Sequence, residues 1–482
     1  MKKRILTLAL GLLLVVLAVS FSACSKPEYT ATFMADDQVV AERVFYKGDT
    51  EIAQVPMVPS KNGYTGTWET YTLGEENITI KAVYTADEYT ATFMADGAVV
   101  KEVKFTIETT ELDEPAVPEK AGFVNGEWDA YELKLENFTI NASYYKTVSS
   151  VEEFMSMDAN GKYALMCDLD LAGMEWTPLF SENDNSSFRG AFDGNGHTIS
   201  NLTIKEKKEY GVGEFGLFSS VAGTVKNLGL VDVNISFSTD YDGYRAGALA
   251  GYTSDEAQIE NCYSTGRVSI SGTDHTAGGL VGWAAGRFER CYSEANVSGD
   301  TAGGLLGVCA ADLLNCYATG NVSAGIKFST TAGGLVGRIM GTSASDVIEI
   351  VNCYALGNVY AGANSRGPSA YAGGLVGASM TSHKIENCFV LGDASAATGG
   401  GVQGNRDSAE AGSIIGDSDA TVENCYYPEG QSVTSSARQE YVWTQGTATA
   451  AENFKNATFL KDTLKFSEDV WVLDGNYPTL KK

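Results

Sequence analysis

The chain has 482 residues and a formal net charge of −27 at neutral pH. This length exceeds what one hydrophobic core usually organises, so several domains or a repeat architecture are expected. The acidic balance argues against nucleic acid as a partner, because a negative surface repels the phosphate backbone. Fifty-three glycines against nine prolines, with plentiful Tyr, Thr and Val, favour many short strands joined by tight turns.

The first residues have the pattern of an export signal. Three basic residues at positions 2–4 precede an uncharged, mostly apolar stretch over 5–19. That stretch is shorter than the roughly 20 apolar residues of a membrane-spanning helix. It ends in small residues before Cys24, and this ending resembles a lipoprotein signal. The resemblance implies a signal peptide over 1–23, a lipid on Cys24 and display on the extracellular face of the membrane. An ordinary cleaved signal with an incidental cysteine is the alternative.

After a short linker over 24–28, residues 29–86 and 87–146 form a duplicated pair. Tyr29–Asp36 recurs letter for letter as Tyr89–Asp96, and each copy closes with Gly-x-Trp and an alternating strand. The tryptophans of this phrase would stack on a sugar or, more simply, fill the core of each module. The two segments resemble the Listeria-Bacteroides repeat, also called the internalin-type B-repeat. That resemblance implies a small β-grasp-like module with a spacer or adhesive role.

Residues 147–244 are expected to hold an N-terminal cap and the first coils of a longer repeat. Ser150-Val-Glu-Glu153 is a capping-box pattern that predicts a short helix through Met157. The alternation that follows Tyr163 predicts a strand. A cap is expected because an open stack of coils leaves unpaired backbone edges.

A phrase close to Ala-Gly-Gly-Leu-Val-Gly recurs six times over 245–428, and each copy is followed by a cysteine phrase, usually Asn-Cys-Tyr. The cysteines are Cys262, Cys291, Cys316, Cys353, Cys388 and Cys425. Three short strands per repeat predict one turn of a parallel coil, with Leu, Val and Cys side chains piled in interior columns. Segment 429–482 is expected to be the C-terminal cap.

A cysteine that returns at one position of every repeat indicates a buried slot, in which the thiol behaves as a small apolar group. We therefore expect unpaired, stacked thiols. Disulfides between neighbouring coils, which an exported chain would otherwise favour, are the alternative.

These repeats resemble the GLUG motif, which is found in secreted bacterial adhesins and some immunoglobulin A peptidases. The resemblance covers about 330 residues of the chain. It implies a right-handed β-helix of the pectate-lyase type without implying lyase activity. The expected fold class is all-β, with a right-handed parallel β-helix preceded by two small β-grasp-like modules.

Motifs for catalysis are missing from the sequence. The three histidines, His197, His275 and His383, are far apart and lack the HExxH spacing, and there is no GxSxG or phosphate-binding loop. No cofactor or metal is expected, and the chain is not predicted to be an enzyme. The alternative is a carbohydrate-active β-helix enzyme, a polysaccharide lyase or glycoside hydrolase, that uses outward carboxylates. The candidates are Asp168, Asp170, Asp193, Asp240, Asp242, Asp417 and Asp419.

The aromatic residue after each repeated cysteine is the candidate ligand-binding residue. Neighbouring side chains on a strand point to opposite faces, so these rings should point outward and align as a stripe. The six residues are Tyr263, Tyr292, Tyr317, Tyr354, Phe389 and Tyr426. The stripe would bind a glycan or a host protein, or simply shield a sheet face from water. The sequence thus predicts a membrane-anchored surface adhesin or display scaffold without catalysis.

Overall fold

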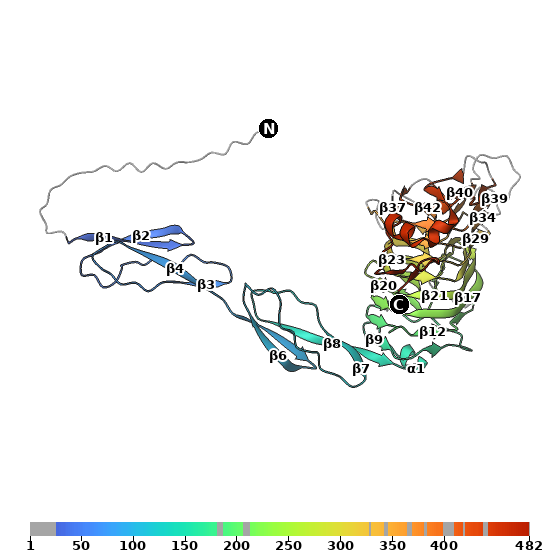
Figure 1. Cartoon of the computed structure of the whole chain (residues 1–482). Helices are drawn as coiled ribbons and strands as arrows, with labels where there is room; N and C mark the ends of the chain where they lie inside the picture. The colour runs from blue at the N-terminus through green and yellow to red at the C-terminus, as the bar shows by residue number, and fades with distance from the viewer. Residues whose placement is uncertain are drawn as a thin grey trace. The chain divides into compact units, whose positions relative to one another are not determined.

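The structure of the protein is a computed structural model. It describes residues 26–481 apart from 181–186, 206–212, 327–328, 342–345, 364–368, 380–382, 399–408, 418–419 and 437–441, and apart from the side chains of 240, 326 and 398. Cys24 and the expected signal lie outside the described residues. Two compact units result (Figure 1). The first contains the chain up to Pro118 together with Glu127–Ser143, and the second contains Glu119–Gly126 together with the chain from Tyr144 onward. No helix in the described part of the chain is long and apolar enough to span a membrane.

Each N-terminal module is a small mixed sheet. In the first module the strand order is β2-β1-β4-β3, with the two central strands parallel and the outer pairs antiparallel. The second module repeats the antiparallel β5–β6 and parallel β5–β8 pairs. The strands are β1 (Glu28–Ala35), β2 (Gln38–Tyr46), β3 (Tyr64–Trp68), β4 (Ile78–Ala86), β5 (Tyr89–Ala95), β6 (Ala98–Phe105), β7 (Phe123–Trp128) and β8 (Phe138–Val148).

The repeated tryptophans belong to the cores of these modules. Trp68 packs edge-on against Phe33 at 4.9 Å and donates its indole N–H to the carbonyl of Pro56. Trp128 makes the equivalent contacts in the second copy. Both indoles thus already have an aromatic neighbour and a hydrogen-bond partner, which favours a packing role over a sugar platform.

The only α-helix among the described residues is α1 (Val151–Met155), which lies in the second unit and ends two residues before the predicted Met157. One bond of the predicted capping box is confirmed, because the N-cap Ser150 hydroxyl accepts the Glu153 backbone N–H. The Glu153 carboxylate accepts the backbone N–H of Ser149, one residue before the N-cap. Phe154 on this helix is fully buried and packs against Phe192 and Phe218 of the first coils. The helix thus places an aromatic plug over the first coils.

The coil itself has three parallel sheet faces. Face one carries β9 (Lys162–Leu165), β11 (Ala191–Asp193), β15 (Phe218–Val221), β16 (Thr224–Lys226), β19 (Ala250–Thr253), β20 (Gln258–Glu260), β23 (Val281–Glu289), β27 (Leu306–Leu314), β31 (Val336–Ile339), β32 (Glu349–Val351), β36 (Val376–Ser379), β37 (Lys384–Glu386) and β41 (Thr421–Glu423). Face three carries β14 (Glu214–Phe215), β18 (Arg245–Ala246), β22 (Thr276–Gly278), β26 (Thr301–Gly303), β30 (Thr330–Gly333), β35 (Ala370–Gly373), β40 (Ala409–Gly412) and β44 (Val442–Trp443).

Face two holds the candidate site. Its strands are β10 (Leu169–Asp170), β12 (Thr198–Ser200), β13 (Thr203–Ile204), β17 (Gly229–Asp242), β21 (Tyr263–Thr273), β24 (Tyr292–Ser293), β25 (Asn296–Gly299), β28 (Tyr317–Ala318), β29 (Val322–Ile326), β33 (Tyr354–Ala355), β34 (Val359–Ala363), β38 (Phe389–Val390), β39 (Ala394–Thr398), β42 (Tyr426–Pro428), β43 (Val433–Ser435) and β45 (Thr447–Thr449). The expected fold class, a right-handed parallel β-helix after two β-grasp-like modules, is confirmed.

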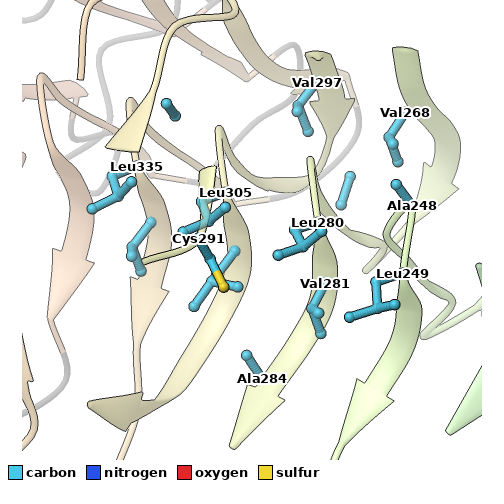
Figure 2. Close-up of a cluster of buried hydrophobic side chains, with 14 of the residues drawn as sticks. Ala248, Leu249, Val268, Leu280, Val281, Ala284, Cys291, Val297, Leu305 and Leu335 are labelled. Carbon is cyan, nitrogen blue, oxygen red and sulfur yellow. The ribbon is translucent and has the colours of Figure 1, made fainter. Parts of the chain in front are cut away.

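Interior side chains form the predicted columns. Leu249, Leu280, Leu305 and Leu335 come from successive coils, are fully buried, and point into one interior (Figure 2). Backbone hydrogen bonds between matching leucines, such as Leu305 N–H to the Leu335 carbonyl at 2.8 Å, hold this register. Each side chain therefore fills the space above its counterpart, as close packing requires.

Two details differ from the predicted strands. The leucine of Gly-Gly-Leu-Val-Gly lies in a bend between the strands of faces three and one. The cysteine of each repeat lies just before a face-two strand rather than within it. The chain turns from face one to face two at the residue before each cysteine, which is usually Asn. This residue has a left-handed backbone conformation, with φ of 50° at Asn261 and 56° at Asn315. Asn tolerates this conformation better than most residues.

The final segment, residues 451–481, which we call the C-terminal strap, packs along the side of the coil. It contains η3 (Ala451–Lys455), η4 (Phe459–Thr463) and the antiparallel pair β46 (Trp471–Val472) and β47 (Thr479–Leu480). Its aromatic side chains contact Tyr317, Tyr354 and Phe389 on face two. The strap therefore covers a side of the coil, although residues 429–482 were expected to cap its end.

Candidate functional site

The six aromatic residues predicted to form a stripe do align on face two. We call them the aromatic ladder: Tyr263, Tyr292, Tyr317, Tyr354, Phe389 and Tyr426. Adjacent rings from Tyr263 to Phe389 stack with centroids 4.6 to 4.8 Å apart and planes within 10° of parallel. The ring spacing matches the spacing of neighbouring strands, so the backbone register sets the stack.

The ladder points outward because the cysteine before each ring points inward. The six cysteines are buried, and their thiols donate to backbone carbonyls, as from Cys291 to Ile259 O at 3.4 Å. The described cysteines are free thiols, as predicted. Burial raises the pKa of Cys262 to about 12, so this thiol stays protonated at neutral pH. Cys262 thus fills an interior slot as a neutral thiol and is not a reactive thiolate.

The prediction that the whole ladder is exposed is wrong for three members. Tyr317 is 4% exposed, Tyr354 is 1% exposed and Phe389 is fully buried. The C-terminal strap covers them: Trp471 lies 6.1 Å from the Tyr317 ring and 5.9 Å from the Tyr354 ring. Any ligand for these three rings would first have to displace the strap.

Further strap contacts complete this cover. Phe454 stacks on Phe389 at 4.9 Å, and the Tyr354 hydroxyl donates to the Pro478 carbonyl at 2.5 Å. Burial raises the pKa of the Tyr354 hydroxyl well above its usual range, so it stays a neutral donor. The remaining members, Tyr263, Tyr292 and Tyr426, are half-buried. The apolar residues of the strap indicate from the sequence that this segment packs against something. The local sequence does not show on which surface it packs.

A second feature of face two lies further along the same coils. We call it the polar groove, a shallow hollow of about 490 Å³ over β25, β29, β34 and β39. One column along it contains Arg267, Asn296, Asn321, Asn358 and Asp393. The Asn-Val-Ser phrases of this surface are typical of strands, and nothing in their pattern indicates a ligand site.

The second column of the groove consists of the residues two positions further on. Ser298, Ser323, Tyr360 and Ser395 are in register on adjacent strands. Tyr360 is 47% exposed, while the valines between the two columns point into the core. A single aromatic ring therefore stands beside hydroxyl and amide groups on an otherwise small-residue surface.

Four of the carboxylates considered for catalysis hold neighbouring coils together: Asp168, Asp170, Asp193 and Asp417. Asp168 accepts the Thr198 backbone N–H at 2.8 Å and lies 3.3 Å from His197 Nδ1. Asp170 accepts from the Asn201 carboxamide at 2.7 Å. The Thr198 hydrogen bond lowers the pKa of Asp168, and the Asn201 one that of Asp170. Both carboxylates are therefore ionised, as coil-to-coil acceptors rather than as acids.

Other candidates behave similarly. Asp193 accepts from Asn195 N–H and from the Asn227 carboxamide, and Asp417 accepts the Ser379 N–H at 2.8 Å. Asp242 lies at the exposed end of β17, whereas Asp419 and the Asp240 side chain lie outside what the structure describes. Within the described ranges, no group of three or more His, Cys, Asp or Glu is arranged to hold a metal ion.

Known proteins share parts of this chain. The model of the GLUG motif matches residues 242–269, as the repeat phrases predicted. Halomucin of Haloquadratum walsbyi is 31% identical over 133 residues, which are 26% of this chain and 1% of halomucin. Internalin H of Listeria monocytogenes is 34% identical over 119 residues, which are 22% of this chain and 20% of that protein. The chain thus spans only a small part of these curated relatives.

Two solved structures align with a large part of this chain. A Bacteroides ovatus protein provisionally described as an immunoglobulin A1 protease aligns over 70% of this chain and 92% of its own, with a TM-score of 0.44 and 23% identity. A second, described as IgA1 protease, aligns over 71% of this chain and 24% of its own, with a TM-score of 0.40 and 16% identity. Similarity at this level says nothing about activity.

Proposed function

We propose that the protein is a lipoprotein of the bacterial surface that displays its β-helix as a non-catalytic adhesin or ligand-binding scaffold. The observation that carries this proposal is the division between inside and outside of the coil. The interior is filled by columns of Leu, Val, Ala and Cys side chains, and the polar and aromatic side chains repeat on the outer faces. A regular outer surface of this kind suits binding of an extended partner.

Anchoring through Cys24 and the spacer role of the two modules rest on the sequence resemblances. The names of two partial relatives, halomucin and Internalin H, add support for a surface location. The partners would be the membrane, through the lipid, and a glycan or a host protein. A strongly acidic surface makes nucleic acid an unsuitable partner.

The absence of catalysis is part of the proposal. Asp168 accepts a backbone N–H from an adjacent coil, and Asp193 accepts one from its own coil. A glycosidase instead needs two carboxyl groups about 5 to 9 Å apart that are free to act on a sugar. Incubating the protein with neutral and acidic polysaccharides should therefore release no shorter products. Product formation would favour the alternative of a carbohydrate-active enzyme.

The test of the surface role is lipid labelling and protease shaving of intact cells. The wild-type chain, expressed in a bacterium that processes lipoproteins, should take up radiolabelled palmitate and be cut by an external protease. Cys24→Ser should lose the label and appear in the medium. Cys167→Ser is the matched control, because Cys167 is a half-buried thiol that hydrogen-bonds to Ser149 O. Label that persists in Cys24→Ser, or a chain protected from the protease, would contradict the proposal.

A further inference from the structure

The polar groove has a flat aromatic platform whose support is a glycine. Tyr360 lies on β34, and Gly362 lies two residues further on the same outer face. A Cβ built on Gly362 would come within 2.6 Å of the Tyr360 hydroxyl and 2.8 Å of ring carbon Cε1. The ring therefore lies down over Gly362, which leaves space for it. Since the side chain remains 47% exposed, the ring offers surface to solvent while packing against the strand.

The amide column beside this platform keeps donors available. The Asn296 carbonyl oxygen Oδ1 accepts the Asn321 backbone N–H at 3.1 Å, and Asn321 Oδ1 accepts that of Asn358 at 3.0 Å. Asn358 continues the pattern with the Asp393 N–H at 3.0 Å. Each side chain is thus fixed through its oxygen, and its amide NH₂ has no hydrogen-bond partner within the described residues. Fixed donors at strand spacing run along the groove.

The charge of the groove selects among ligands. Its lining contains one cation, Arg267, and one anion, Asp393, so its formal charges cancel. The chain around it carries a net charge of −27, which opposes binding of a polyanion.

The backbone also excludes one common mode of peptide binding. β29 pairs with β25 and β34, and β34 pairs with β29 and β39. No strand edge is therefore open within the groove for a peptide to extend the sheet. The remaining chemistry is a flat aromatic face with nearby amide donors and serine hydroxyls, which matches a sugar ring with an apolar C–H face and hydroxyl edges.

We propose that the polar groove binds a neutral oligosaccharide, with one sugar ring stacked on Tyr360 and its hydroxyls accepting from the amides of Asn321 and Asn358. The volume of about 490 Å³ lies in the usual range for a small ligand. This inference deepens the proposed binding function and rests on it. It places the ligand away from the aromatic ladder, whose central rings are under the strap.

The experiment measures binding of residues 25–482 to an array of neutral, uronic-acid and sulfated oligosaccharides, followed by titration calorimetry with the best neutral binder. Tyr360→Ala should weaken that binding roughly tenfold, which corresponds to about 1.4 kcal/mol, because it removes the aromatic face on which the sugar stacks. Gly362→Ala keeps the aromatic ring but lifts it, and should weaken binding by several-fold. The matched control is Tyr46→Ala, which removes a tyrosine of similar exposure, 44%, from the first module and should leave the affinity unchanged.

Each outcome is decisive. Selective binding of a neutral glycan that both groove variants weaken supports the proposal. Neutral-glycan binding that neither variant changes overturns the groove as the site but leaves the proposed function standing. A preference for acidic glycans, or binding to host-cell protein with no glycan bound, overturns the ligand class alone. Failure to bind any glycan, protein extract or cell surface would overturn the inference and the binding function together. Unchanged melting temperatures of the variants verify that their folds are intact.

Discussion

Replacing Trp471 by alanine should release the C-terminal strap from the aromatic ladder. Its indole is buried, lies 4.8 Å from the Phe466 ring and touches Tyr317 and Tyr354 across the strap interface. The indole N–H also donates to the Asn315 side-chain oxygen at 3.1 Å. These contacts join the strap to two neighbouring coils, so their loss acts on docking of the strap more than on the coils themselves.

The expected increase in the population of undocked strap follows from the free-energy cost of removing a buried aromatic side chain. Trp-to-Ala changes in cores cost about 3–5 kcal/mol, which corresponds to roughly 10²- to 10⁴-fold more of the undocked strap. Because cleavage of a rapidly opening segment tracks the open population, proteolysis within the strap should accelerate by a similar factor. Trypsin reports on this directly, since the strap contains Lys455, Lys461 and Lys465.

The assay is limited trypsin digestion with mass spectrometry, together with far-ultraviolet circular dichroism of the coil. Trp176→Ala is the control, because this buried indole also donates to a backbone carbonyl, that of Leu217, but lies in the first coils. It should destabilise those coils without speeding cleavage in the strap. The reasoning would be refuted if trypsin cleaved the strap of Trp471→Ala at a rate within about threefold of the wild-type rate. Loss of the β signal of the whole coil in this variant would refute it as well.

Three further predictions concern the coil interior. Leu335→Ala should lower the free energy of unfolding of the coil, measured in urea, by about 2–5 kcal/mol, because it leaves a cavity between adjacent leucines. Leu335→Met, which conserves the volume, should lower it by less than about 1.5 kcal/mol. Equal costs for the two variants would contradict column packing. Iodoacetamide should label the half-buried Cys167 in the native protein, while Cys262, whose pKa burial raises to about 12, should react only after denaturation; native labelling of Cys262 would show that its coil is open. Burial lowers the pKa of His275 and His383, and their Nδ1 atoms accept backbone N–H groups, so both are neutral in the folded chain. Their stabilising contribution is complete above the unfolded pKa of about 6.5 and is lost as pH falls through the folded values. Proton NMR should therefore show both titrating below 6.5, with stability decreasing from pH 7 to 5, and a value at or above 6.5 for either would count against this account.

Much of the coil could be predicted because its information is local and repeated. The phrase around Leu335 recurs at a spacing that allows one turn of three strands, and alternation along a strand places Cys353 inward and Tyr354 outward. A slip of one residue would turn the whole apolar set to solvent, so the register was determined by the pattern itself. The capping box at Ser150 is local for the same reason.

The coil, the order of its columns and the alignment of its aromatic ladder all follow from local, repeated patterns in the chain. Which parts of the coil are accessible depends instead on contacts between segments that are distant in the sequence. Trp471 contacts Tyr317 across more than a hundred residues of chain, and docking over such a distance depends on the summed packing of the strap rather than on any periodic signal. The exposure of Tyr360 likewise follows from an adjacent glycine and from neighbouring coils that carry serine at the same position, which is a relation between strands in space.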